Sequence, residues 1–316
     1  MDKPDLSRLE QYVQAYDYPT DLLIETVAHC NLSCVMCPQR SLTRPRGRMA
    51  YELWTKIVDE VAEVSPSTRL WPALMGEPLV MAPEIFRWLR YAKHAGIEHI
   101  ALNTNLNLLR PDHAESLVTS GVDEVIVGID AATVDLYREI RVDGNLERVR
   151  RAVSYLASTK ARLASRTPRI VLQFVVMDEN EHEEAAFVEQ WQKSGLEVDL
   201  KIKPRTGWGG TMPVWRGMTA GRAPRRIPCT WLLRQLTVFW NGQVPQCDGD
   251  WNGRTRHGNL NRQSVAEVWY GTLAKLRQRH LSGDYAFAPC RDCQDWSAGL
   301  SNTIHCGRPA AAARER

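Results

Sequence analysis

Three cysteines at the spacing C-x3-C-x2-C are the feature that most constrains what this chain can fold into. Cys30, Cys34 and Cys37 follow residues 22–27, an apolar and β-branched run that is typical of a β-strand. Three thiolates can hold three corners of a four-iron cluster and leave one iron open for an external ligand, whereas four thiolates close the cluster. A zinc knuckle or a redox C-x-x-C pair is the alternative, but His29 is poorly placed as a fourth zinc ligand.

The composition limits which cellular compartments and which binding partners are expected for this chain. No apolar run reaches the roughly 18 residues that a membrane-spanning helix needs, and the N-terminus has no signal-peptide core. Eight cysteines in a chain of 316 residues favour metal ligation in a reducing compartment over disulfides. The net charge of +3 is too small to predict nucleic-acid binding. We therefore expect a cytoplasmic protein with no nucleic-acid partner and no membrane partner.

Strand-like and helix-like segments alternate through the first two hundred residues. The predicted strands are 22–27, 69–74, 99–102, 124–129, 170–176 and 198–202. The predicted helices are 51–64, 83–95, 111–120, 146–156 and 183–193. Because strands joined by crossover helices form a parallel sheet, the pattern predicts an α/β fold. Functional residues should then follow the C-terminal ends of the strands.

A second set of cysteines lies in the last third of the chain. Its pattern is C-x17-C, a gap, and C-x2-C, formed by Cys229, Cys247, Cys290 and Cys293. Asn241-Gly242 predicts the turn of a β-hairpin, and a capping box at Ser264 predicts an amphipathic helix to about residue 280. Four thiolates would close a cluster, which suits electron transfer better than substrate binding. A zinc ribbon is the alternative interpretation.

The first motif closely resembles the signature of the radical S-adenosylmethionine (radical SAM) enzymes, and the second resembles their SPASM or Twitch module. The resemblance implies a partial (β/α)6 TIM-type barrel over residues 1–203, a linker over 204–228, and an auxiliary iron–sulfur domain with a hairpin and a helix over 229–308. Residues 309–316 are expected to be a disordered tail. The implied cofactors are a SAM-binding [4Fe–4S] cluster on three cysteines, one auxiliary [4Fe–4S] cluster, and SAM. An external one-electron reductant such as flavodoxin or ferredoxin is the implied partner.

The same resemblance assigns SAM contacts to short motifs that follow the strands. Met75-Gly76-Glu77-Pro78 is similar to the family's Gly-Gly-Glu-Pro, with Met in place of the first Gly, and Gly128 takes the place of Ser in the family's Ser-x-Asp. The residues expected to bind SAM are Met36, Gly76, Glu77, Asn103, Asn105, Asp130 and Arg141. Alternatively, Gly76-Glu77 is a plain turn, Asp130 caps the following helix, and Arg141 lies on the surface.

The resemblance implies reductive cleavage of SAM to a 5′-deoxyadenosyl radical and hydrogen abstraction from a substrate C–H bond. The cysteine pattern is similar to aminocyclitol and aminoglycoside dehydrogenases and epimerases, so we expect a small polyhydroxylated substrate (a sugar, aminocyclitol or aminoglycoside) whose alcohol is oxidised to a ketone. Asp248 and Asp250 are candidates for taking the hydroxyl proton. Cys306 is either an ordinary thiol, a cluster ligand that replaces one of the four cysteines, or the hydrogen donor of a redox-neutral epimerase.

Two further alternatives remain open at this point. A peptide or protein maturase is less favoured, because such enzymes often carry an N-terminal peptide-binding domain and roughly twenty residues precede the first predicted strand. A non-enzymatic iron–sulfur electron carrier or sensor would not cleave SAM.

Overall fold

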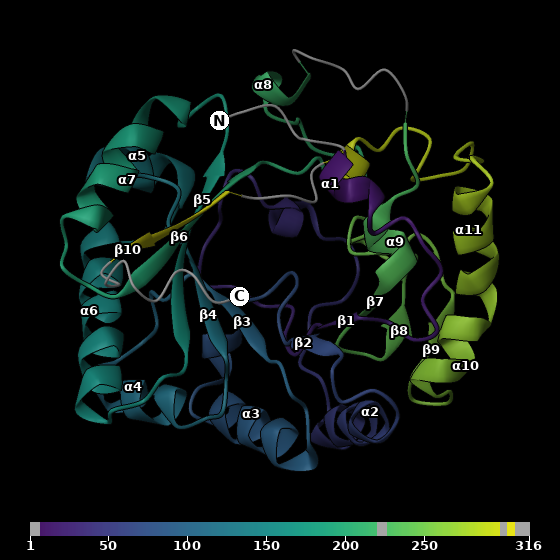
Figure 1. The fold of residues 1–316 in the computed structure, drawn as a ribbon, viewed down its shortest axis with the longest axis horizontal. Helices are drawn as coiled ribbons and strands as arrows, with labels where there is room; N and C mark the ends of the chain where they lie inside the picture. Colours follow the sequence, from purple (N-terminus) through teal and green to yellow (C-terminus); the bar gives the residue numbers. More distant parts are fainter. Residues whose placement is uncertain (1–6, 220–225, 298–301, 307–316) are drawn as a thin grey trace.

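The computed structural model describes residues 7–219, 226–297 and 302–306, and its strands form an open barrel (Figure 1). One sheet has the order β7-β1-β2 and the other the order β3-β4-β5-β6-β10, and a parallel bridge between Leu70 and Ile100 joins β2 to β3. The ladders from β7 to β6 are parallel, and β10 runs antiparallel to β6. The bounds of these strands are Asp21–Ile24 (β1), Arg69–Trp71 (β2), Ala101–Thr104 (β3), Glu124–Gly128 (β4), Arg169–Val176 (β5), Val198–Pro204 (β6), Gln235–Val238 (β7) and Asn302–Cys306 (β10).

Helices cover the outer face of the barrel, as Figure 1 shows. Their bounds are Tyr51–Val64 (α2), Glu84–Ala95 (α3), Pro111–Val118 (α4), Val134–Ile140 (α5), Leu146–Arg162 (α6) and Glu184–Gln192 (α7). In α2 the residues Leu53, Trp54, Ile57, Val58 and Val61 recur at helical spacing, so they share one face and pack into the core. None of the described helices combines the length and the apolar character that crossing a membrane requires.

The α/β prediction and the alternating strands and helices are confirmed, with local differences. The predicted helix after Ser264 breaks at Gly271 into Val265–Tyr270 (α10) and Thr272–Leu281 (α11). The shorter helices Ser7–Glu10 (α1), Arg216–Thr219 (α8) and Thr230–Arg234 (α9) were not predicted, and neither was α5. The predicted tail, residues 309–316, lies outside the described residues.

The predicted hairpin turn forms, but its two strands pair elsewhere. The Gly242 N–H donates to the Phe239 carbonyl (2.8 Å), and Gly242 has a φ of 82°, which glycine adopts without strain. Before this turn β7 pairs with β1, and after it Gln243–Val244 (β8) pairs with Gly258–Asn259 (β9). Part of the predicted auxiliary domain therefore completes an edge of the barrel.

A buried ion pair connects the loop after the first cysteine motif to the C-terminal region. Both carboxylate oxygens of Glu25, which is fully buried, accept hydrogen bonds from the Arg44 guanidinium (2.8 and 2.5 Å). The same guanidinium lies 3.9 Å above the Phe239 ring, and the backbone N–H groups of Thr43 and Arg44 donate to the Asn252 side chain. This pair therefore fixes the loop between the barrel and the second cysteine set.

We expect Glu25→Gln to lower the free energy of unfolding by about 3–5 kcal/mol, because the substitution leaves the buried Arg44 charge uncompensated. The measurement is urea denaturation of the purified chain. As a control, Glu84→Gln removes an exposed ion pair with Arg48 and should cost less than about 1 kcal/mol. Equal effects of the two substitutions would contradict the role of the buried pair.

Candidate active site

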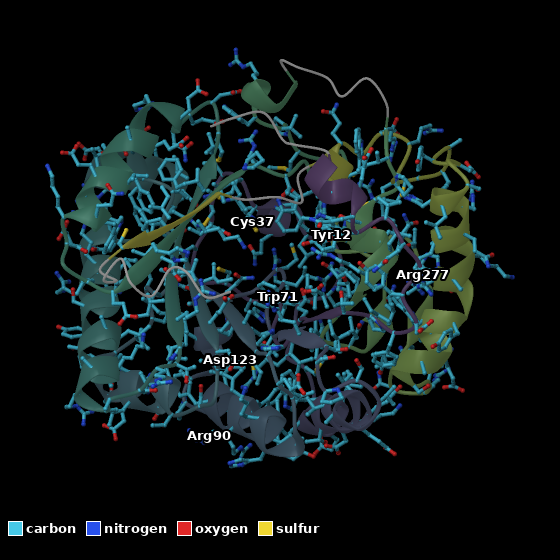
Figure 2. All side chains as sticks on the ribbon, viewed as in Figure 1. Tyr12, Cys37, Trp71, Arg90, Asp123 and Arg277 are labelled. Carbon is cyan, nitrogen blue, oxygen red and sulfur yellow. The ribbon has the colours of Figure 1, made fainter. Side chains whose placement is uncertain are left out.

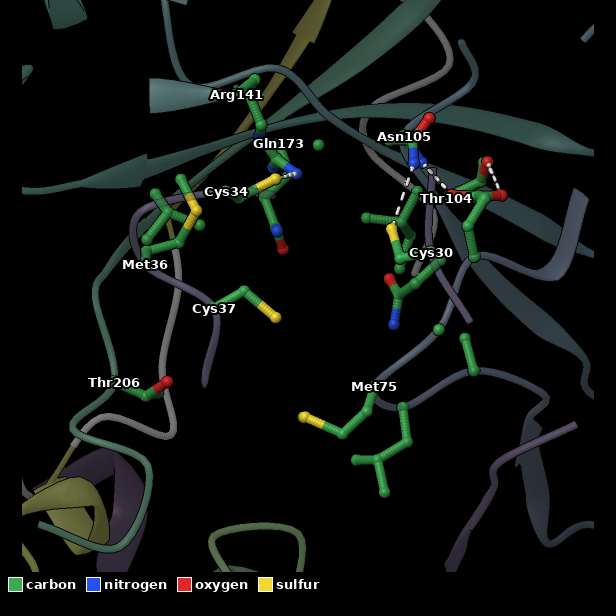
Figure 3. Close-up of a pocket in the computed structure, with 18 of the residues that line it drawn as sticks. Cys30, Cys34, Met36, Cys37, Met75, Thr104, Asn105, Arg141, Gln173 and Thr206 are labelled. Carbon is green, nitrogen blue, oxygen red and sulfur yellow. Dashed lines mark hydrogen bonds between the residues drawn. The ribbon is translucent and has the colours of Figure 1, made fainter. Parts of the chain in front are cut away.

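The first cysteine motif follows β1 and lines a cavity at the C-terminal ends of the strands. Figure 3 shows Cys30, Cys34 and Cys37 around the same space. Burial, with a smaller contribution from the neighbouring Cys34, raises the pKa of Cys30 to about 11 and that of Cys37 to about 12. Cys34 is buried and the other two are partly buried, so the three adjacent thiols become thiolates only when a cationic centre compensates their charge; the donor set therefore fits a bound metal group.

The arrangement does not fit a single metal ion. Within the described ranges, no three His, Cys, Asp or Glu side chains come together closely enough to hold one ion. The cysteine ligands of a four-iron cluster bind different iron atoms, so they lie farther apart than the ligands of one zinc ion.

Gly76 brings the turn after β2 into direct contact with the cysteine loop. A Cβ at this position would lie 2.0 Å from the Val27 carbonyl oxygen and 2.8 Å from that of His29, so only glycine fits. The next residue, Glu77, donates its backbone N–H to the His29 carbonyl at 2.9 Å. The predicted Gly76-Glu77 motif is thus part of the wall of the cavity.

The Glu77 carboxylate is buried at this wall and holds the ends of two strands together. It accepts hydrogen bonds from the backbone of Leu79 (3.0 Å), the hydroxyl of Thr104 (2.7 Å) and the backbone of Asn105 (2.7 Å). Burial raises the pKa of Glu77, and these donors oppose the shift. Two oxygens with three donors retain capacity for one more, so Glu77 can still meet a ligand in the cavity.

Met36, Asn103 and Asn105 line the same cavity, and their contact with SAM stays a prediction. The Asn105 amide donates to the Asn31 side chain at 3.0 Å and lies 3.8 Å from the Cys30 sulfur. The Met36 carbonyl accepts from the indole N–H of Trp208 at 3.0 Å.

Asp130 does not face the cavity, so the predicted SAM contact of this residue is wrong. Its carboxylate is fully buried and accepts from the Arg141 guanidinium (2.7 Å) and from the Val175 backbone (2.7 Å). The alternative prediction fails as well, because Thr133 caps the following helix α5. Asp130 instead positions Arg141, which lines the cavity and lies 3.5 Å from the Cys34 sulfur.

Gly128 explains how Arg141 reaches this place. A Cβ on Gly128 would lie 2.1 Å from a terminal nitrogen of the guanidinium. The departure from the family's Ser at this position therefore makes room for the Arg141 side chain.

The second cysteine set converges in the C-terminal region. Cys229 precedes α9, Cys247 follows β8, and Cys290 and Cys293 follow α11. Burial raises the pKa of Cys229 to about 12, and burial together with Asp248 and the three other thiols raises that of Cys247 well above its usual range. The effects on Cys247 indicate that the other three thiols lie near it, as an auxiliary cluster requires.

Two side chains that the sequence did not single out contact Cys290. The Gln246 amide donates to the Cys290 sulfur at 2.8 Å, and His280 Nε2 lies 3.3 Å from it. His280 Nδ1 accepts the backbone N–H of Cys229 (3.1 Å), so the ring proton is on Nε2 and points at the sulfur. Burial lowers the pKa of His280 to about 4, so the ring is neutral. In the sequence, the one signal for these contacts is that Gln246 directly precedes Cys247.

Asp248 and Asp250 have different surroundings. Asp248 lines the inner part of the cavity, where burial and the nearby Asp295 raise its pKa to about 7. Asp250 is buried, and its carboxylate accepts from the backbone N–H groups of Arg254 and Thr255 and from the Thr255 hydroxyl. The predicted catalytic role of Asp250 is therefore wrong, because its oxygens stabilise its own turn.

Cys306 lies far from the cavity, so its predicted catalytic role is also wrong. It pairs with Val198, the first residue of β6, whereas Lys203 near the other end of the strand lines the cavity. Five residues of a strand span about 16 Å. The Cys306 side chain is buried in the same apolar core as Val198, on the face of the sheet that packs against the helices.

The inner part of the cavity contains residues that the sequence did not identify. It shares Asn103, Gln173, Lys203 and Trp208 with the part beside the cysteine loop, so the two parts are contiguous. Its other lining residues include Lys201, Trp71 and Trp231. Figure 2 shows Trp71 and Cys37 in the centre of the molecule, with Arg90 at its periphery.

Relatives of this chain have diverse activities. The tungsten-containing aldehyde ferredoxin oxidoreductase cofactor-modifying protein of Pyrococcus furiosus is 28% identical over 163 residues, which cover 50% of this chain and 44% of the relative. A probable GTP 3′,8-cyclase of Methanococcus maripaludis is 30% identical over 174 residues (54% of each chain), and the mycofactocin maturase MftC of Mycobacterium tuberculosis is 26% identical over 160 residues (50% and 39%). The chain spans about half the length of the curated relatives that it matches.

Solved structures share the fold over most of the chain. BtrN in complex with AdoMet and 2-DOIA superposes with a TM-score of 0.63 at 16% identity, covering 89% of this chain and 94% of BtrN. Streptococcus suis SuiB bound to the precursor peptide SuiA gives a TM-score of 0.67 at 13% identity, covering 93% of this chain and 73% of SuiB. At these identities the likeness establishes the fold, including the partial barrel, and no substrate.

Family models match both cysteine sets. The model of the radical SAM superfamily matches residues 24–189, and the model of the SPASM iron–sulfur cluster-binding domain matches residues 229–294. These domains confirm the predicted cofactors, namely a SAM-binding [4Fe–4S] cluster, auxiliary iron–sulfur ligation and SAM, and radical SAM enzymes need a reductant. The chain belongs to the radical SAM superfamily and carries a SPASM domain.

Proposed function

We propose that this protein is a radical SAM dehydrogenase that oxidises an alcohol of a small polyhydroxylated substrate, such as a sugar, aminocyclitol or aminoglycoside, to a ketone. The continuous cavity carries the proposal. One part is lined by Cys30, Cys34 and Cys37, and the inner part by Asp248, which directly follows Cys247 of the auxiliary set. A substrate in this cavity would lie between the two cysteine sets.

The chain's own residues would bind and orient the cofactors. Cys30, Cys34 and Cys37 would hold the SAM-binding cluster, and the other four cysteines the auxiliary cluster. When bound, SAM and the clusters supply a 5′-deoxyadenosyl radical, which removes the hydrogen atom of the alcohol carbon, and an acceptor for the remaining electron. Arg141, held by Asp130, would pair with the SAM carboxylate, and Glu77 would accept from its amino group.

Asp248 would take the hydroxyl proton of the substrate. Its carboxylate lines the cavity beside Cys247, so the proton and the second electron would leave the substrate on the same side. With the hydrogen atom removed by the radical, these two transfers complete the two-electron oxidation of the alcohol.

The remaining wall of the inner cavity suits a hydroxyl-rich molecule. Asn103 and Gln173 present amide groups that can both donate and accept hydrogen bonds. Trp71, Trp208 and Trp231 present indole rings that can pack against the C–H faces of a sugar ring.

A peptide substrate is the second candidate, favoured by the structural likeness to SuiB bound to its precursor peptide. Epimerisation with Cys306 as hydrogen donor is not proposed, because that thiol lies in the core on the other face of the sheet.

The first test is SAM cleavage by the anaerobically reconstituted protein. With dithionite and SAM we expect 5′-deoxyadenosine, and about eight iron atoms per chain for two four-iron clusters. Cys30→Ala should abolish 5′-deoxyadenosine formation, whereas Cys306→Ala, a matched loss of one thiol outside the cavity, should leave it unchanged. No cleavage by the wild-type protein would contradict the enzyme assignment, and about four iron atoms would contradict the auxiliary cluster.

Gly128→Ser should weaken SAM binding by about tenfold, because the new side chain displaces the Arg141 guanidinium and removes a charge-assisted contact. Calorimetric titration of the reconstituted protein with SAM measures this effect. Arg141→Lys, which retains the charge and loses the bidentate geometry, should give an intermediate affinity. Wild-type affinity in Gly128→Ser would show that Arg141 does not contact SAM.

The proposed oxidation is tested by mass spectrometry of a small-molecule extract incubated with the reconstituted protein, SAM and reductant. A SAM-dependent product should be lighter than its precursor by about 2 Da, the mass of two hydrogen atoms. Asp248→Asn should lower formation of this product by about 100-fold while 5′-deoxyadenosine is still formed. A product of unchanged mass, or a modified peptide only, would overturn the dehydrogenase proposal.

A further inference from the structure

Two lysines of β6 point into the inner part of the cavity. Lys201 and Lys203 are two residues apart on the strand, so they lie on the same face of the sheet. Leu200 and Ile202 alternate with them and pack into the core between the sheet and the helices. Both lysines line the cavity together with Asp248.

Neither ammonium group forms an ion pair with a carboxylate of the described residues. Over the ranges that the structure describes, no acidic side chain lies within ion-pair distance of Lys201 or Lys203, and neither lysine has a hydrogen-bond acceptor. Glu124, the acid that acts on Lys201, is already paired with Arg169 at 2.6 Å.

The charged groups that line the inner cavity carry a positive excess. Two acids outside the lining, Asp130 and Asp295, also act on Lys203, but Asp130 is paired with Arg141 and Asp295 accepts the backbone N–H groups of Gly207 and Gly209. Asp21 accepts the indole N–H of Trp71 (2.9 Å) and faces Arg234 at 3.8 Å, so these two charges offset each other. Asp248 then remains as the only carboxylate among the described lining residues to balance Lys201 and Lys203.

The same wall has donors in excess of acceptors. The indole N–H of Trp231 is buried and has no acceptor among the described residues. Lysine and tryptophan side chains can only donate hydrogen bonds, and a buried donor without a partner costs free energy. A ligand that brings negative charge and acceptor oxygens would satisfy this wall.

We propose that the substrate carries an anionic group, a carboxylate or a phosphate, and that Lys201 and Lys203 bind this group at the inner end of the cavity. This inference rests on the proposed function, because it names the substrate class of that same site. It favours acidic or phosphorylated sugars over cationic aminocyclitols and aminoglycosides, whose ammonium groups the two lysines would repel.

The charge of the site depends on pH in a defined direction. Burial lowers the pKa of Lys201 to about 8, and Lys203, Arg69 and Arg169 lower it as well, while Glu124 opposes the shift. Lys201 is therefore charged at pH 7 and loses its proton as the pH rises past its pKa. Anion binding should weaken between pH 7 and pH 9.

The test is calorimetric titration of the reconstituted protein, without reductant, with sulfate as a phosphate-like probe and with acetate as a carboxylate probe. We expect at least one probe to bind, and the tighter one indicates the type of group. Lys201→Gln should weaken binding by about tenfold, and Lys201→Arg should retain it. Lys275→Gln, which removes an exposed lysine of α11, is the matched control and should bind as the wild-type protein does.

Three outcomes would overturn the inference: neither anion binds the wild-type protein, Lys201→Gln binds as tightly as the wild type, or saturating SAM abolishes binding. The last outcome would assign the lysines to the SAM carboxylate. Because the titration needs no turnover, the proposed substrate class and the proposed function can be refuted independently. Oxidation without anion binding would refute only the substrate class, whereas anion binding without 5′-deoxyadenosine formation would refute the proposed function.

Discussion

The pairing of Arg141 with Asp130 is the constraint on which the arrangement of the site depends. A guanidinium buried beside thiols needs a compensating charge, and Asp130 supplies it while its second oxygen holds the backbone of β5 at Val175. Asp130 adopts a left-handed backbone conformation (φ 65°), which aspartate tolerates better than most residues. Gly128, which leaves space, and Asp130, which supplies a buried carboxylate, therefore position Arg141 together.

Much of the barrel could be predicted because local signals determine it. The apolar spacing of α2 gave its bounds without error, and both cysteine sets were evident from spacing alone. The partner of β7 could not be predicted, because a strand pattern does not encode a neighbour more than two hundred residues away. The roles first assigned to Asp250 and Cys306 failed for the same reason. Their residue types suit the chemistry, but turn geometry and strand register decide where each side chain lies.

Lys201 and Lys203 show a second limit of sequence reasoning. Alternating apolar and charged residues are typical of a strand with one face in water. In a barrel the second face lines the interior, so the same alternation places two charges inside the protein. Only the surrounding strands distinguish the two cases, and here they leave the ammonium groups facing a cavity.

One thiol of the auxiliary set, Cys290, contacts two polar side chains, whereas Cys293 accepts the backbone N–H of Asp295 at 3.4 Å. Cys290 receives a hydrogen bond from Gln246 and faces the ring N–H of the neutral His280. Hydrogen bonds to ligating sulfur raise the reduction potential of an iron–sulfur cluster, so these two contacts would raise the potential of a cluster held by Cys290 without adding a formal charge.

The position of β7 has a consequence for how the protein is made. The edge of β1 remains without its neighbour on that side until residues 235–238 have been synthesised, about three quarters of the way along the chain. Until then the nascent barrel presents an open row of backbone donors and acceptors, which favours pairing with other chains. The C-terminal region thus protects the first strand during biogenesis, in addition to providing the second set of cysteines.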